Sequence, residues 1–345
     1  MIRFTSKKIL LNIANTITPN ALFLLKNISE LKGKQSVYQN QHNEYLNKLQ
    51  IDAIINNTLS SNYIDGLIID NKSFIELFEE LIEPSNDLQS EMIRYVKVLN
   101  TINSHYENID VNPELFLQFH RNLFGYKENY GGYWRSNSEI NDNYLLPVKR
   151  IEFDNIQTDI DNLCSSYQEL ISDPLLIDLV VISAFILDFM SMLPFDKGNG
   201  RMIRLISLLL LYKQNYNVVK YISIDQIIKE NYSRYLYSLS TTIQDFQEDN
   251  ENISLWIECF LWILNNAYLK LDNLISPLSN KKGAKTNQVK IIVDTMNNTF
   301  KISDIADKCP GISRPTINKV LQELRDQGEI SPLSLGRDAV WQKKL

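Results

Sequence analysis

Cysteine is scarce in this 345-residue chain. Its three cysteines stand far apart, at Cys164, Cys259 and Cys309. An odd number of widely spaced cysteines excludes a disulfide framework and a cysteine-ligated metal site. The same scarcity is typical of a protein that stays in a reducing compartment, and no metal centre is expected.

The chain also lacks a long uninterrupted apolar run. The apolar stretch within its first eleven residues is too short for a secretion signal. The most apolar segment, residues 174–192, carries Asp178 and Asp188, which disfavours insertion into a membrane. We therefore expect a cytoplasmic protein without a membrane partner.

Length and charge indicate one large and one small domain. With 44% hydrophobic residues the chain has enough apolar surface for a sizeable core. Residues 281–345 hold 12 Lys or Arg against 7 Asp or Glu, whereas the whole chain has a net charge of -6, so we expect an anionic partner for this part. The predicted divisions are residues 1–110, 111–275, a polar linker at 276–286, and 287–345.

Two apolar helices are predicted around one glycine-containing turn. Residues 174–192 are apolar on almost every side, and a second apolar run follows from Asn199. The turn between them therefore forms a helix N-terminus, whose N–H groups and dipole attract anions. Arg201 and Arg204 project from the same side of that helix and can contact neighbouring phosphate oxygens. The pattern predicts a polyphosphate site made by Gly198, Asn199, Gly200, Arg201 and Arg204.

Two better-known glycine motifs do not match this turn. The dinucleotide fingerprint needs a third glycine where Ile203 stands, and the P-loop ending Gly-Lys-Ser/Thr is absent here. A plain alternative stays open, in which the glycine turn only joins two core helices and the arginines form surface ion pairs.

The segment Leu193–Arg204 resembles the signature of the Fic family: His-Pro-Phe, two residues, Gly-Asn-Gly-Arg, two residues, Arg. The resemblance covers most of residues 50–275, and further matching segments are residues 119–124, 131–135, 184–189 and 220–223. It implies an all-α fold, a Fic-type helical bundle with a small β-hairpin flap. It also implies an enzyme that mostly moves AMP from ATP to a hydroxyl group of a target protein, releasing diphosphate.

Two positions depart from the family signature. Leu193 stands where the family has a histidine that acts as general base, and a leucine cannot accept a proton. Loss of a positioned base typically lowers a rate by about 10²- to 10⁴-fold.

The second departure is Lys197, which stands where the family usually has the Asp or Glu that holds magnesium. An ammonium cannot ligate a metal but can contact a triphosphate. The catalytic positions are thus Leu193, Arg201 and Arg204, ATP is the implied ligand, and magnesium stays open.

No histidine elsewhere in the chain is an evident replacement for the missing base. The chain has only His42, His105 and His120. His120 lies in a helix that is predicted to begin at Asn112-Pro113 and to stop at Gly125. Packing is therefore the favoured role for His120.

Ser61, Asp65 and Gly66 resemble the family's inhibitory motif, a Ser or Thr, three residues, then Glu and Gly or Asn, with Asp in place of Glu. In the family that glutamate reaches the second signature arginine, which here is Arg204, and blocks the productive pose of the γ-phosphate. A helix that ends at Gly66 explains the same residues without regulation, so both interpretations stay open.

Two further positions are implied for the target and the nucleotide. Residues 131–153 predict a hairpin around a polar turn, where the family has its target-docking flap. An edge hairpin can bind an extended segment of a target protein by strand addition, although a purely structural hairpin explains it equally well. Tyr235 falls where related proteins have an aromatic residue near the adenine, while core packing explains a tyrosine as well.

Residues 287–345 resemble a winged helix-turn-helix domain. Helices are predicted at 289–296, 302–308 and 313–327, and wing strands at 330–333 and 339–342. The side chains expected to face DNA are Arg314, Thr316, Asn318, Lys319, Gln322 and Arg325, with Arg337 at the wing tip. Winged helices also bind proteins, and one copy with modest positive charge would bind DNA weakly, so a homodimer would strengthen the contact.

Two functions follow as alternatives. In the first, the protein descends from protein adenylyltransferases, binds nucleotide and is weak or inactive in transfer because of Leu193. A surviving transferase would need substrate-assisted or water-mediated deprotonation. In the second, the protein is a DNA-binding regulator, a pseudoenzyme whose Fic domain senses nucleotide.

Overall fold

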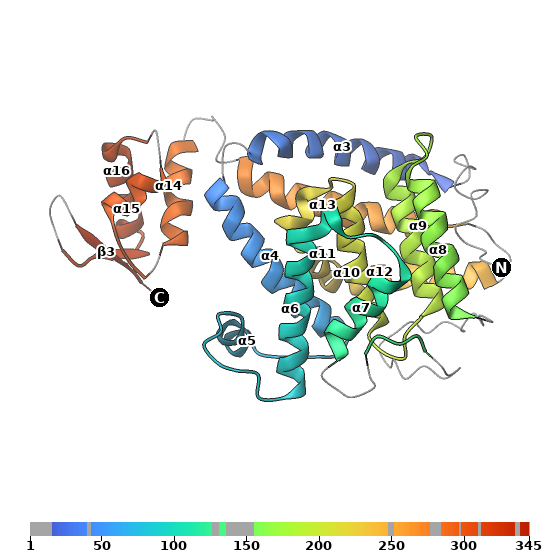
Figure 1. The fold of residues 1–345 in the computed structure, drawn as a ribbon. Helices are drawn as coiled ribbons and strands as arrows, with labels where there is room; N and C mark the ends of the chain where they lie inside the picture. The colour runs from blue at the N-terminus through green and yellow to red at the C-terminus, as the bar shows by residue number, and fades with distance from the viewer. Residues whose placement is uncertain are drawn as a thin grey trace. The chain divides into compact units, whose positions relative to one another are not determined.

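The computed structural model describes residues 16–39, 43–125, 131–135, 155–247, 252–276, 284–296, 298–309, 312–334 and 339–344 (Figure 1). The chain divides into two compact units, Met1–Lys32 with Ile51–Tyr268, and Gly33–Gln50 with Leu269–Leu345. The described residues are mainly helical, which confirms the predicted all-α class. Most of the predicted flap, from residue 136 to 153, lies outside the described residues.

A series of helices runs from Pro19 to Ile275. They are α3 (Pro19–Gln39), α4 (Asn43–Ile64), α5 (Asn71–Phe78), α6 (Asp87–His105), α7 (Pro113–Phe124), α8 (Ile156–Ile171), α9 (Asp178–Met192), α10 (Asn199–Lys213), α11 (Ile224–Glu230), α12 (Tyr232–Gln247) and α13 (Ser254–Ile275), with 3-10 turns at Tyr106–Asn108 and Asn217–Lys220.

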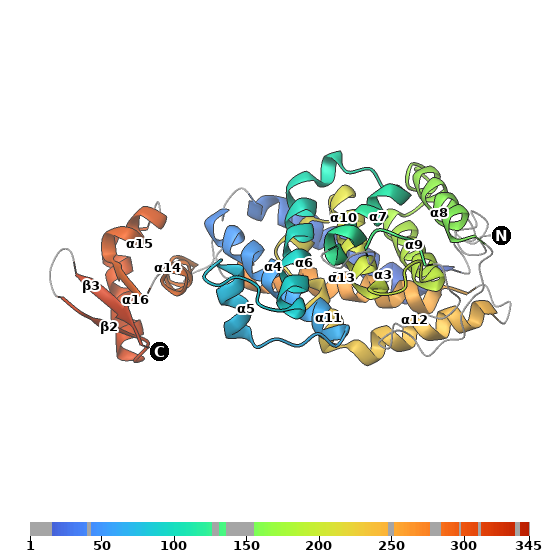
Figure 2. The same ribbon diagram turned by 60° about the horizontal axis from the view of Figure 1, so that its bottom comes forward.

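Helices α9 and α10 form the centre of the first unit. Every residue of α9 from Leu179 to Met192 is buried, as its nearly continuous apolar sequence predicts. The helix begins at Asp178 rather than at Pro174, because residues 174–177 form a turn before it. Helix α10 contacts α6, α7 and α9, and Figures 1 and 2 show it inside the bundle. The glycine turn between α9 and α10 is therefore held on both sides by buried helices.

Two helix ends bring further residues to this turn. Helix α7 begins after the cap Asn112, whose side chain accepts a hydrogen bond from the Leu115 N–H at 2.8 Å, and it ends at Gly125, as predicted. Helix α4 ends at Ile64, and Gly66 follows with φ of 79°, a left-handed value that favours glycine. Asp65 lies between the end of α4 and this glycine.

The second unit contains the C-terminal helices and the one sheet among the described residues. The elements are α14 (Ala284–Thr295), β1 (Thr299–Lys301), α15 (Ile302–Lys308), α16 (Arg314–Asp326), β2 (Ile330–Pro332) and β3 (Val340–Lys343). The sheet is antiparallel with the order β1-β3-β2. The three helices and the two last strands agree with the prediction; β1 was not predicted, and α14 begins inside the expected linker 276–286.

Apolar residues from all these elements form one core in the C-terminal part. The apolar residues of α16 that recur at helical spacing are buried: Ile317, Val320, Leu321 and Leu324. Phe300 from β1 and Trp341 from β3 pack into the same cluster. Because the buried residues of α16 lie on one face, its opposite face is left for other contacts.

Candidate functional site

The signature loop, residues 193–198, joins α9 to α10 in a fixed conformation. Leu193 ends α9 with φ of 44°, and Gly198 begins α10 with φ of 74°. The side chain of Asn199 reaches back along the loop, accepting from the Phe195 N–H at 2.9 Å and donating to the Phe195 carbonyl at 2.8 Å. Arg135 Nε donates to the Leu193 carbonyl at 2.9 Å, which holds the start of the loop.

Two glycines of the turn lie in close contact with their neighbours. A Cβ atom at Gly198 would come within 2.5 Å of the Phe124 ring, and one at Gly200 within 2.9 Å of Asp65 Oδ1. Gly198 to Gly200 are buried, whereas Asp196 and Lys197 are exposed. Asp196 and Lys197, in the middle of the loop, therefore face solvent. The following glycines pack against Phe124 of α7 and against Asp65, the residue after α4.

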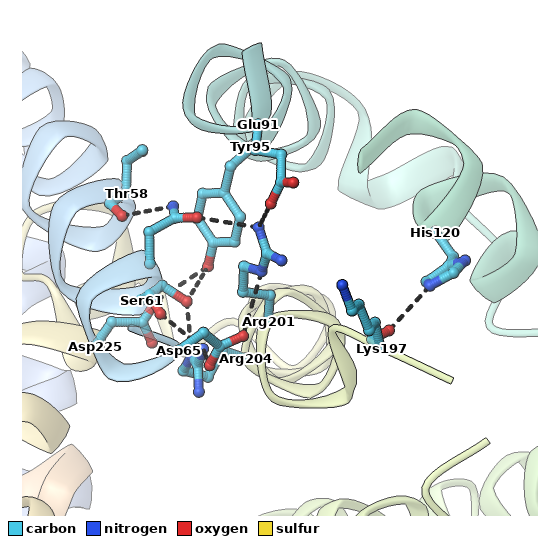
Figure 3. Close-up of polar contacts among 11 residues, drawn as sticks. Thr58, Ser61, Asp65, Glu91, Tyr95, His120, Lys197, Arg201, Arg204 and Asp225 are labelled. Atoms are coloured by element: carbon cyan, nitrogen blue, oxygen red, sulfur yellow. Dashed lines mark hydrogen bonds and ion pairs between the residues drawn. The ribbon is translucent and has the colours of Figure 1, made fainter. Parts of the chain in front are cut away.

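Arg201 and Arg204 converge on one carboxylate (Figure 3). Asp65 Oδ2 lies 3.2 Å from Arg201 Nε, and its Oδ1 lies 2.6 Å from Arg204 Nη2. The two arginines are 5% and 4% exposed, so the alternative of surface ion pairs is wrong. A single carboxylate that bridges both side chains means that the two guanidinium groups point to one place, as their spacing predicts.

A second carboxylate, Glu91 of α6, contacts Arg201. Its Oε2 lies 2.7 Å from Arg201 Nη1, which also donates to Asn62 Oδ1 at 3.2 Å. The Arg201 guanidinium lies 4.8 Å from the centre of the Phe124 ring. Arg201 is thus held by acidic groups from two different parts of the fold.

Arg204 is held by the end of α4. Its Nε donates to Ser61 Oγ at 2.6 Å and its Nη2 to the Ser61 carbonyl at 2.8 Å. Burial alone would lower the pKa of Arg204, but the nearby carboxylates of Asp65 and Asp225 raise it above its ordinary value. Arg204 therefore stays charged inside the protein.

A buried polar group lies behind Arg204. Tyr95 donates its hydroxyl to Ser61 Oγ at 2.8 Å and to Asp225 Oδ2 at 3.2 Å. Burial raises the pKa of Asp225 to about 6, although the positive charge of Arg204 acts in the opposite direction. Through Asp225, helix α11 contributes a buried carboxylate next to Arg204 and Tyr95.

His120 of α7 contacts the signature loop through a hydrogen bond and ring stacking. Its Nδ1 accepts from the Gly132 N–H at 3.0 Å, and its Nε2 lies 3.1 Å from the Lys197 carbonyl oxygen, so the neutral ring carries its proton on Nε2. The ring is stacked on Phe195 with centroids 4.0 Å apart. Burial lowers the pKa of His120 to about 4, which agrees with a packing role.

The low pKa of His120 predicts a loss of stability in acid. The unfolded chain binds a proton near pH 6.5 and the folded chain only near pH 4, so stability falls as the pH drops from about 6.5 to 4. From pH 7.5 to pH 5 this group should cost about 2 kcal/mol of the free energy of unfolding. Urea denaturation of the original chain and of His120→Asn at both pH values measures the difference.

Asp225 also changes the stability over this pH range, but in the opposite direction, because its raised pKa makes the folded chain less stable as the pH rises towards 6. Both proteins contain Asp225, so comparing the original chain with His120→Asn cancels its contribution. An equal loss of stability in both proteins between pH 7.5 and pH 5 would contradict a neutral, buried His120.

The other predicted residues are placed differently. Leu193 is half-buried and offers no proton acceptor. Tyr235, the position implied for adenine contact, is buried, and its ring packs edge-on against Trp256 at 5.5 Å between centroids. Tyr232 is half-buried, and its pKa is raised by burial and influenced by both Arg204 and Asp65. Tyr232 is thus the more accessible tyrosine beside the arginines.

The C-terminal residues expected to face DNA lie mostly on the exposed face of α16. Arg314, Asn318, Lys319, Gln322 and Arg325 are exposed, while Thr316 is half-buried. Ser313 precedes the helix, and its hydroxyl lies 2.9 Å from that of Thr316 without capping the helix. Arg337 lies outside the described residues.

Sequence reasoning missed five residues of the site: Asn62, Glu91, Tyr95, Arg135 and Asp225. Arg135 stands in a segment that resembles the Fic family, which was a usable signal. Glu91 and Tyr95 share one face of α6 because they are four residues apart, but nothing in the sequence pairs that face with α10.

The architecture is that of solved Fic proteins. A Fic family protein from Desulfovibrio desulfuricans G20 matches 95% of this chain and 97% of its own, with a TM-score of 0.62 and 16% identity. A Fic domain containing signaling protein from Bacteroides thetaiotaomicron matches 73% of this chain and 97% of its own, with a TM-score of 0.59 and 17% identity. Fic-1 from C. elegans matches 74% of this chain and 73% of its own, with a TM-score of 0.57 and 14% identity.

No protein-family model and no curated protein matches the chain. The structural likeness at this identity establishes the fold. The chain therefore has the Fic fold, which confirms what the segment Leu193–Arg204 implied for its architecture.

Among the helices that the structure describes, none is long and apolar enough to cross a membrane.

Proposed function

We propose that the chain is a Fic-type protein that binds a nucleoside triphosphate and transfers AMP slowly or not at all. The observation that carries this proposal is the shared Asp65 carboxylate, 3.2 Å from Arg201 and 2.6 Å from Arg204. A carboxylate and a phosphate both offer oxygen acceptors to a pair of guanidinium groups. Asp65 therefore occupies the position that an oxyanion of the nucleotide would take.

Leu193 accounts for the weak transfer. In the reaction implied by the resemblance, a target hydroxyl attacks the α-phosphorus, the bond to the β-phosphate oxygen breaks, and the hydroxyl proton needs an acceptor. Leucine has none, and His120 is engaged through both ring nitrogens with the Gly132 and Lys197 backbone. Nucleotide binding and turnover are thus separated in this chain.

Asp65 and Ser61 make the site self-blocked. Both bind Arg204, and Gly66 follows the end of α4, where Asp65 contacts the arginines. ATP must displace this carboxylate to reach the guanidinium groups. The contact supports the inhibitory role that the resemblance implies for Ser61, Asp65 and Gly66.

Restoring the two missing groups should raise transfer. We expect Leu193→His with Lys197→Asp, in an Asp65→Asn chain, to label itself or a target with AMP at least 100-fold faster than Asp65→Asn alone. The measurement uses ATP labelled at the α-phosphate and counts label on protein. Leu193→Gln with Lys197→Asp is the matched control, because glutamine is polar but is not a base. Strong labelling by the unmodified chain would overturn the proposed loss of transfer.

The C-terminal part supports a second function, DNA binding by a winged helix. The specific observation is that α16 buries one face in the local core and exposes Arg314, Lys319 and Arg325 on the other. Basic and amide side chains on an exposed helix suit phosphate and base contacts in a DNA groove. In this alternative the Fic fold reports nucleotide to a DNA-binding module.

Removing two of those charges should weaken DNA binding uniformly. We expect Lys319→Ala with Arg325→Ala to lower the affinity for duplex DNA at least tenfold and to reduce its dependence on salt concentration. A gel-shift series at increasing salt measures both effects. Lys72→Ala on α5, which removes an exposed charge from the first unit, is the control. DNA affinity that ignores both salt and the α16 substitutions would contradict groove binding.

A further inference from the structure

The signature loop does not fit the magnesium ion that the Fic resemblance implies. Magnesium takes oxygen ligands from one or two carboxylates together with phosphates. Here the position of the usual carboxylate is Lys197, and an ammonium has no lone pair to donate. The two carboxylates that lie nearest the arginines, Asp65 and Glu91, are bound to them. Nowhere in the described ranges do three His, Cys, Asp or Glu residues gather as a metal site.

Lys197 is positioned to act on an anion. Its backbone carbonyl oxygen lies 3.1 Å from His120 Nε2, and this hydrogen bond holds the backbone of Lys197 in place. Figure 3 shows its side chain directed away from His120 and towards Arg201. The residue as a whole is exposed. The loop around Lys197 is also held in place by the Asn199 side chain, which is hydrogen-bonded to the N–H and the carbonyl of Phe195.

We propose that polyphosphate binding at the signature loop is independent of divalent cations, with Lys197 supplying the positive charge, and that the metal-free nucleotide is the preferred ligand. This inference rests on the proposed nucleotide-binding function and specifies the form of its ligand. The chemical class is a polyphosphate anion without bound metal.

The charges at the site support this preference. Exchanging a carboxylate for an ammonium makes the loop more positive by two units. Metal-free ATP carries about two more negative charges than its magnesium complex, so it would gain more from Lys197, Arg201 and Arg204 once Asp65 is displaced from the arginines. A magnesium ion bound to phosphates at this loop would be repelled by the ammonium of Lys197, because both are positively charged. The expected result is competition between magnesium and the protein for the nucleotide.

The test is calorimetric titration of the full chain with ATP at constant ionic strength, once in excess EDTA and once in excess magnesium. The chain, Lys197→Asp and Lys197→Gln are compared, each also in an Asp65→Asn background that opens the arginines. We expect the chain to bind metal-free ATP at least tenfold more tightly than magnesium-bound ATP. Lys197→Asp should reverse this order, and Lys197→Gln should bring the two affinities within about threefold of each other.

The outcomes separate the inference from the function on which it rests. Magnesium that strengthens ATP binding to the unmodified chain as much as to Lys197→Asp would overturn the inference and leave nucleotide binding intact. Equal affinities for both forms of ATP in all three proteins would overturn it too, because Lys197 would then have no part in the choice. If ATP binds to none of the proteins, including those with Asp65→Asn, the proposed function fails together with the inference.

Discussion

Replacing Asp65 and Glu91 together by Asn and Gln should raise ATP affinity at least 100-fold. Each substitution keeps the size of the side chain and removes the charge that holds an arginine. Hydrogen bonds to charged groups contribute about 1.5–3 kcal/mol each, so ending one such contact at each arginine amounts to about 3 kcal/mol or more. Since 1.4 kcal/mol is a factor of ten, the double change corresponds to about two orders of magnitude.

The two single variants divide this effect. Asp65→Asn should have the larger share, because Asp65 contacts both Arg201 and Arg204, whereas Glu91 contacts Arg201. Calorimetry with ATP measures all four proteins, and Glu76→Gln on the exposed face of α5 is the matched control. Affinity that stays constant across the series would show that the carboxylates do not compete with nucleotide.

The double variant should also be less stable without its ligand. It leaves the buried Arg201 without a carboxylate and the buried Arg204 with only Asp225 nearby, and breaking a buried ion pair from one side is costly. Bound ATP would restore the opposite charge, so its melting temperature should rise with ATP concentration more than that of the unmodified chain. This coupling distinguishes a filled anion site from a nonspecific change in the fold.

The centre of the site could be predicted because its residues are close in sequence. The apolar character of α9 and α10 fixes two buried helices, and the glycines between them fix a turn at a helix N-terminus. Arg201 and Arg204 are three residues apart on one helix, so their convergence follows from helical geometry alone. The caps Asn112 and Gly125 of α7 follow from equally local rules.

The partners of the arginines could not be predicted in the same way. Glu91 and Asp225 lie on α6 and α11, and their distance from the arginines depends on how those helices pack against α10. Asp65 was found only because its neighbours resemble a known motif. For Tyr235 the resemblance was misleading: its position matches the family, but its ring packs in the core against Trp256. Strand β1 has three residues, too few for an alternating pattern.

The arginine site is preformed, because its geometry is fixed by groups that belong to the protein. The signature loop is held by Asn199 and Arg135, Arg201 by Glu91, and Arg204 by Ser61. A nucleotide would therefore exchange one set of oxygen partners for another without reorganising the backbone of the loop. Such preorganisation favours binding of an anion, whereas Leu193 supplies no proton acceptor, as the proposed function requires.

Arg204→Ala is expected to remove both nucleotide affinity and stability. Under the proposed function Arg204 supplies charge-assisted contacts to phosphate, so without it ATP binding should weaken at least tenfold. The substitution also leaves the buried carboxylate of Asp225 without its neighbouring cation, whereas Asp65 keeps Arg201, and this should cost about 3–5 kcal/mol. In a domain of this size that corresponds to a fall in melting temperature of roughly 6–20 °C.

A second substitution tests the cause of this instability. Adding Asp225→Asn to Arg204→Ala should recover part of the lost melting temperature, because the amide can be buried without a counter-charge. Asp225→Asn alone should destabilise the chain, since Arg204 then loses a favourable neighbour. Arg94→Ala on α6, whose exposed side chain donates to the Asn122 carbonyl, is the control and should change little. If Asp225→Asn lowers the melting temperature equally with and without Arg204, the two groups are not coupled and the buried charge is not the reason for the loss.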